Sequence, residues 1–186
     1  QVTYDDNTTE DIDMTDPAVT IKTGSPADVN NPNVKLEYKS QETTFNITVN
    51  DPIQSLSVAT PMTQGEYDHG DTLNFAGLTL AAVTKSGATK TITNTTPGLA
   101  ISETQADVNS PNFTKITGTS NVEVKGTQII KFTYDGKTAQ QTIIVNDRIS
   151  SVNIVTQPNK TAIKYGEALD LTGATVKITL ASGDTT

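Results

Sequence analysis

The chain repeats itself: shifted by 96 positions against its own sequence, it aligns apolar residues with apolar residues and glycines with glycines. An internal repeat constrains the fold more than any other feature here, because one folding unit must then occur more than once. The front of the unit aligns as Ile53 with Ile149, Leu56 with Val152, Leu73 with Leu169, Gly77 with Gly173 and Ser86-Gly87 with Ser182-Gly183. The rear aligns as Val34 with Ile130, Leu36 with Phe132, Ile47 with Ile143 and Asn50-Asp51 with Asn146-Asp147.

This alignment predicts three parts. Residues 52–147 form a complete repeat, residues 1–51 the rear part of one, and residues 148–186 the front part of the next. Gln1-Val2-Thr3-Tyr4 is expected to align with Thr91-Ile92-Thr93-Asn94, so that the two parts would join head to tail within a longer array. Each part alone would expose an apolar face and open strand edges. We therefore expect neighbouring chain, or strand exchange with another copy, to complete them.

Apolar residues alternate with polar ones throughout the repeat, which indicates half-buried strands. Examples are Ala174, Val176, Ile178 and Leu180, and Phe45, Ile47 and Val49. Residues that tolerate tight hairpins stand between such runs, among them Ser86-Gly87, Asp135-Gly136 and Ser182-Gly183. No stretch carries a helical period. The pattern predicts an all-β chain, in which each repeat packs two antiparallel sheets face to face.

One segment resembles a known family. The string from Tyr165 to Val176, which contains Tyr165-Gly166-Glu167 and Leu169-Asp170-Leu171, is followed by the turn Ala181-Ser182-Gly183-Asp184. It is similar to the bacterial immunoglobulin-like domain of group 3, and residues 69–78 carry a weaker version. The resemblance implies tandem immunoglobulin-like antiparallel β-sandwiches. It also implies an extracellular, cell-surface or wall-attached location, where such domains act as spacers.

Several functions are disfavoured by composition. The net charge of −8 argues against a nucleic-acid partner, and no apolar run is long enough for membrane insertion. There is no cysteine, no nucleophile elbow and no glycine-rich phosphate loop. The single histidine, His69, aligns with Tyr165 and is interpreted as a packing residue. We therefore expect no enzymatic activity and assign no catalytic, cofactor-binding or metal-binding residue.

Calcium is the one cofactor that the residues leave open, because it binds six to eight oxygen ligands. The acidic segment contains Asp5, Asp6, Asn7, Glu10, Asp11, Asp13 and Asp16, but it lacks the spacing of an EF-hand, which favours a solvated loop. The pairs Asn50-Asp51 and Asn146-Asp147 end the two rear parts. A short, stiff connector is favoured there over a calcium-bound joint.

Two functions of different classes follow from this reading. The first is a non-enzymatic structural repeat of an extracellular bacterial surface fibre or stalk, which spaces a terminal adhesive or functional domain from the cell. The alternative is an adhesin module that binds a glycan or a host protein through variable loops at residues 5–33 and 93–128. An aromatic content of 5% counts against sugar stacking. Expected partners are neighbouring repeats of the same chain, with lateral or head-to-tail self-association as a further expectation.

Overall fold

The computed structural model describes residues 1–116 and 124–185. Half of the chain lies in strands and none of the described residues lies in a helix, so the predicted all-β class is confirmed. The chain forms two compact units, the first comprising residues 1–52 and 84–88, and the second residues 53–83 and 89–186.

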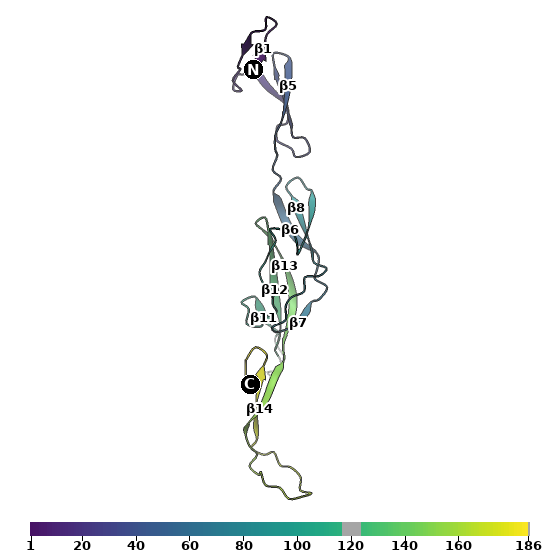
Figure 1. Cartoon of the computed structure of the whole chain (residues 1–186), viewed down its shortest axis with the longest axis vertical. Coiled ribbons are helices and arrows are strands. Elements are labelled where there is room, and N and C mark those ends of the chain that lie inside the picture. The colour runs from purple at the N-terminus through teal and green to yellow at the C-terminus, as the bar shows by residue number, and fades with distance from the viewer. Residues whose placement is uncertain (117–123, 186) are drawn as a thin grey trace. The chain divides into compact units, whose positions relative to one another are not determined.

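Two sheets enclose the core of the second unit (Figure 1). One contains β6 (Ile53–Thr60), β8 (Thr79–Thr84) and β9 (Thr89–Thr93). The other contains β10 (Ala100–Ile101), β12 (Val124–Tyr134), β13 (Lys137–Asp147) and β7 (Glu66–Asp68), with β11 (Phe113–Lys115) beside β12. The pairs β8–β9, β10–β12, β11–β12 and β12–β13 are antiparallel, whereas β7 pairs with β13 in parallel.

The core forms because alternate residues of each strand point inward. Leu80 of β8, Ile130 and Phe132 of β12, and Val145 of β13 are completely buried. The ring of Phe75 packs edge-on against Phe132 with a centroid distance of 6.4 Å. Burying each such side chain contributes roughly 1.5–3 kcal/mol, so this core stabilises the unit without any disulfide.

Residues 148–186 copy the local structure of residues 52–90. Strands β14 (Ile149–Thr156) and β15 (Thr175–Leu180) have the bounds of β6 and β8, displaced by 96 positions. In Figure 1, β14 and the yellow strand β15 lie side by side, and the chain between them forms a long loop. Six backbone hydrogen bonds recur at the same displacement. Within residues 52–88, the amide donors and their carbonyl acceptors are Thr63 to Ala76, Asp71 to Asp68, Leu78 to Phe75, Thr84 to Ala88, Lys85 to Pro52 and Gly87 to Thr84. The counterparts, in the same order, are Asn159 to Thr172, Glu167 to Lys164, Ala174 to Leu171, Leu180 to Asp184, Ala181 to Arg148 and Gly183 to Leu180.

The apolar side chains of residues 148–186 are nevertheless exposed. Ile149, Val152, Ile154, Leu169, Leu171 and Val176 are between 40% and 65% exposed. Their counterparts Ile53, Leu56, Leu73 and Leu80 are buried, and Val58 and Phe75 pack against the core. The same strands therefore form in both places, but residues 148–186 lack a second sheet over their apolar face.

The first unit contains a three-stranded sheet of β3 (Val19–Thr23), β4 (Asn33–Tyr38) and β5 (Gln41–Asn46). Leu36 pairs with Thr43 as Phe132 pairs with Ala139, and Ile21 pairs with Leu36 as Ile101 pairs with Phe132. The two-residue turn at Lys39-Ser40 has positive φ angles, as does the turn at Asp135-Gly136. This is the geometry that joins two twisted strands in a tight hairpin.

One predicted strand is shorter than the sequence indicates. The alternation of Phe45, Ile47 and Val49 predicts a strand to residue 49, but β5 ends at Asn46. Its pairing with β4 ends beside Pro32, whose carbonyl accepts the Ile47 amide hydrogen. Proline has no N–H to return, so the ladder stops there.

The predicted alignment of Gln1–Tyr4 with Thr91–Asn94 is wrong. Strands β1 (Val2–Thr3) and β2 (Thr9–Glu10) form a hairpin in which Thr3 pairs with Thr9. The equivalent pairs are Val83 with Thr89 and Thr179 with Thr185. The Tyr4 and Asn7 amides donate to Thr8 and Tyr4 carbonyls, as Thr84 and Gly87 donate to Ala88 and Thr84. Residues 1–9 therefore correspond to residues 81–89, and they duplicate residues 177–185.

A matched pair of truncations tests the difference between the two apolar faces. Leu80→Ala should lower the free energy of unfolding by about 2–5 kcal/mol, because it opens a cavity in a packed core. Val176→Ala, at the corresponding position, should change it by less than about 0.5 kcal/mol in dilute solution. Urea unfolding followed by circular dichroism measures both, and equal losses would contradict the described burial.

Candidate functional site

The acidic N-terminal residues close their own turns. An Asp6 oxygen accepts hydrogen bonds from the Thr8 amide and hydroxyl at 2.9 and 2.6 Å, and Asp13 holds Thr15 in the same way. These hydrogen bonds favour the carboxylate form and lower the pKa of both Asp6 and Asp13. Within the described ranges, no three His, Cys, Asp or Glu side chains gather as a metal site.

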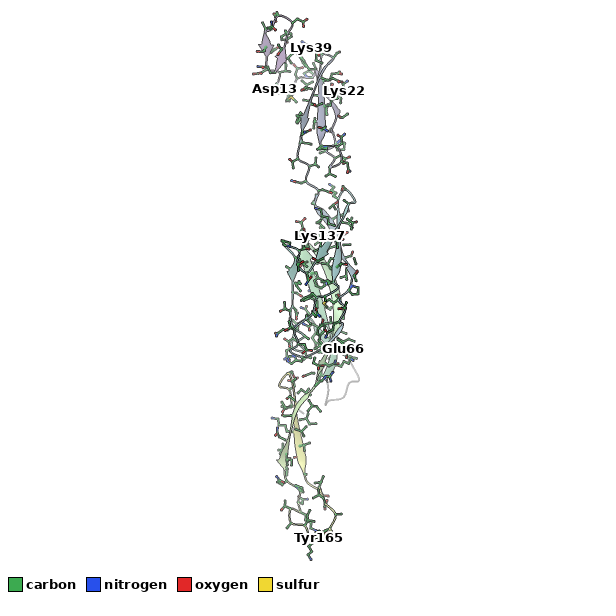
Figure 2. The ribbon with its side chains drawn as sticks, turned by 45° about the vertical axis from the view of Figure 1, so that its right-hand side comes forward. Asp13, Lys22, Lys39, Glu66, Lys137 and Tyr165 are labelled. Atoms are coloured by element: carbon green, nitrogen blue, oxygen red, sulfur yellow. The ribbon has the colours of Figure 1, made fainter. Side chains whose placement is uncertain are left out.

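His69 is mostly buried, with 18% of its side chain exposed. Its Nδ1 accepts a hydrogen bond from the Val108 amide at 3.3 Å and lies 3.4 Å from Asp107. The ring thus braces the 107–108 backbone, in agreement with its interpretation as a packing residue. Its counterpart Tyr165, labelled in Figure 2, is fully exposed.

The first unusual polar contact involves Asp51. Its two carboxylate oxygens accept hydrogen bonds from the Ser86 amide at 2.9 Å and the Ser86 hydroxyl at 2.6 Å. The next residue, Pro52, accepts the Lys85 amide hydrogen at 2.9 Å. The residues before β6 are therefore fastened to the Ser86-Gly87 turn by backbone and side-chain hydrogen bonds.

The same contact occurs at Asp147. Its Oδ1 accepts the Ser182 amide hydrogen at 3.0 Å, and the Arg148 carbonyl accepts that of Ala181 at 2.9 Å. Asp147 is only 1% exposed, and its Oδ2 has no hydrogen-bond partner. The Ser182 hydroxyl accepts the Asp184 amide hydrogen at 3.2 Å. We call these two contacts, Asp51 with Ser86 and Asp147 with Ser182, the aspartate–turn joints.

The second joint is flanked by ion pairs from β7. The carboxylate of Glu66, labelled in Figure 2, accepts hydrogen bonds from the side-chain amide of Asn146 at 2.8 Å and from Lys125 Nζ at 3.0 Å. The Asn146 and Lys125 hydrogen bonds lower the pKa of the Glu66 carboxyl group. Asp68 accepts a hydrogen bond from Arg148 Nε at 2.7 Å. The residues on either side of Asp147 are thus held to the parallel strand.

Each joint fastens the residues before a strand to a turn further along the chain. The sequence pattern indicates both Asn-Asp pairs but does not indicate their partners, Ser86 and Ser182. The sequence does contain one indication of these contacts, because the aspartate and the serine are 35 residues apart in both joints.

The predicted loop at residues 93–128 is partly ordered by a buried side chain; its residues 117–123 lie outside the described residues. Gln128 is completely buried, accepts the Asp107 amide hydrogen at 2.9 Å, and donates to Glu103. Glu103 also accepts hydrogen bonds from Ser110 and Asn112. Residues 103–112 are therefore anchored to β12, and β10 and β11 also lie within the predicted loop. The loop predicted at residues 5–33 likewise contains β2 and β3.

Removing the joint carboxylates should free the turns. In Asp51→Ala and Asp147→Ala, the Ser86 and Ser182 amides lose their acceptor, so their hydrogen exchange should accelerate by about tenfold, since a hydrogen bond to a charged group contributes about 1.5–3 kcal/mol. Exchange measured by NMR reports each amide separately. Asp147→Asn keeps the Oδ1 acceptor and serves as the control. Unchanged exchange in both alanine variants would refute the joints.

Glu66 should make stability depend on pH. Because its folded-state pKa lies below the usual 4.5, its contribution is present above that pH and is lost as pH falls through the folded-state pKa. Glu66→Gln should therefore melt at a lower temperature than the unchanged chain at pH 7, and the two melting temperatures should converge once the pH falls below the folded-state pKa of Glu66. Calorimetry over this pH range measures the difference, and a gap that persists in acid would contradict the assignment.

Comparisons with known proteins do not assign the chain to a family. No protein-family model matches the chain, and neither the curated proteins nor the solved structures contain a significant match. Among the described residues, there is no helix with the length and apolar character needed to cross a membrane.

Proposed function

We propose that the chain is a non-enzymatic structural repeat of an extracellular bacterial surface fibre or stalk, built from tandem immunoglobulin-like sandwiches. The aspartate–turn joint, which occurs twice at the displacement of 96 positions, carries the proposal. A spacer needs folded units and connectors that do not swing freely. The hydrogen bond from the serine amide to the aspartate supports the second requirement, and it occurs at both places.

The connectors themselves support this role. Only Arg148 separates β13 from β14, and Pro52, with its restricted φ, separates Asp51 from β6. A connector of one residue has few torsions, and the joint hydrogen bonds restrict those that remain. The likeness of residues 165–176 to the group 3 bacterial immunoglobulin-like domain supports the same role.

An adhesin module is the second candidate. One observation favours it: strand β11 has no counterpart strand among the described residues 1–51. Differences of this kind are typical of binding loops. Gln128 and Glu103 hold the described residues 103–112 to β12, because Glu103 accepts hydrogen bonds from Gln128, Ser110 and Asn112.

Stretching single molecules of the full chain tests the spacer role. Residues 52–147 should unfold in one discrete step that releases on the order of 300 Å of chain, because extended residues span about 3.3–3.6 Å each. Leu80→Ala should lower the force of this step, whereas Val176→Ala should leave it unchanged. Gradual lengthening at low force without a step would contradict the proposal.

A binding assay separates the two candidates. The full chain should show no saturable binding on a glycan array or to intact host cells. Saturable binding that disappears when residues 117–123 are deleted, while the unfolding transition stays unchanged, would favour the adhesin.

A further inference from the structure

Two apolar surfaces are not covered by any of the residues that the structure describes. One is the face of β14, β15 and their connecting loop, which includes Leu171 and Val176. The other is a cleft of about 590 Å³ in the first unit, lined by apolar and charged side chains that include Ile12, Val19, Leu36 and Tyr38. Each surface lies within a different segment of the chain.

The second unit shows what covers each surface. Leu36, Tyr38 and Val19 take the strand positions of Phe132, Tyr134 and Leu99, which line or contact the core. That core is closed by β6, β8 and Phe75, the counterparts of β14, β15 and Leu171. The cleft in the first unit is therefore open where the second unit is filled by the equivalents of residues 148–186.

We propose that residues 148–186 of one copy pack on residues 1–51 of a second copy, so that each such contact completes one two-layered sandwich head to tail. In this complex β15 lies beside β2 as β8 lies beside β9. The register of β8 and β9, in which Leu80 pairs with Ile92, then places Val176 opposite Ile12. This inference goes beyond the spacer role and names the partner as a second copy.

Charge supports this register. Ala81 pairs with Thr91 in the second unit, and the corresponding residues of the complex are Lys177 and Asp11. Opposite charges directly across two strands are favourable, whereas a slip of one residue would separate them and turn the apolar face outward. The alignment thus pairs charge with charge and apolar side chain with apolar side chain.

Strand β1 must give way to β15 in this complex. It pairs with β2 through two residues only, Val2 with Glu10 and Thr3 with Thr9. Ile178 and Thr179 would take those two positions. The bridge between Thr179 and Thr185 must open as well, because Thr9 would take the place of Thr185. The register of β8 with β9 then gives five paired positions, Thr175–Thr179 with Asp13–Thr9, in place of these three, and apolar surface is buried, so the exchange is favourable.

Mixed single-cysteine chains test the register directly, because the natural chain contains no cysteine. Ile12→Cys and Val176→Cys are placed on separate full-length copies that carry distinguishable tags and are mixed under oxidising conditions. Residues directly opposite on antiparallel strands lie within disulfide reach. We expect the mixed disulfide dimer to exceed that formed when exposed Thr44→Cys replaces Ile12→Cys. Equal amounts would overturn the proposal.

Sedimentation of chains without added cysteine gives an independent readout. The unchanged chain should associate as its concentration rises, and Leu171→Asp should abolish this association. Val155→Asp is the matched control, because Val155 is equally exposed but its counterpart Ala59 lies outside the core. A chain that stays monomeric, or association that both variants weaken equally, would refute the docking. The single-molecule test of the spacer role does not depend on either result.

Discussion

The structure depends on one constraint: a sheet with one apolar face is stable only when a second layer covers that face. Residues 52–147 meet this requirement within their own chain, where Leu80 and Phe132 from opposite sheets are fully buried. Residues 148–186 form the same strands and turns with the same hydrogen bonds, yet Leu171 and Val176 remain exposed. Local structure in this chain is thus encoded by short-range turn chemistry, whereas burial needs a partner from another segment or another copy.

The aspartate–turn joints fix the residues that precede β6 and β14. Each aspartate lies just before a connector and fastens it to a turn 35 residues further along the chain. The two joints differ in one respect: Asp51 receives both the amide and the hydroxyl hydrogen of its serine, whereas one oxygen of buried Asp147 has no partner. Glu66 and Asp68 compensate by holding the residues on either side of Asp147. Recurrence of the joint in two sequence contexts supports a role in stiffening the connection.

Much of this architecture could be predicted from the sequence. Alternation and the repeat displacement located β14 and β15, and glycines marked the turns at Gly87 and Gly183. The errors have physical causes. Pro32 ends the β4–β5 ladder, an effect that apolar alternation in β5 alone does not reveal. The hairpin at residues 1–11 has Asn7 where its counterparts have glycine, so its likeness to the Ser86-Gly87 turn was hidden. Neither serine of the joints was found, because a hydrogen bond across 35 residues leaves no local pattern.

The central claim is that residues 1–51 and 148–186 are complementary layers of one sandwich. The most direct measurement is the thermal unfolding of a single chain in which residues 148–186 are followed immediately by residues 11–51, which omits the duplicated hairpin. The account predicts one cooperative calorimetric transition, lost when Leu171 is replaced by Asp. A chain that shows no cooperative transition, or one that Leu171→Asp leaves unchanged, would contradict it.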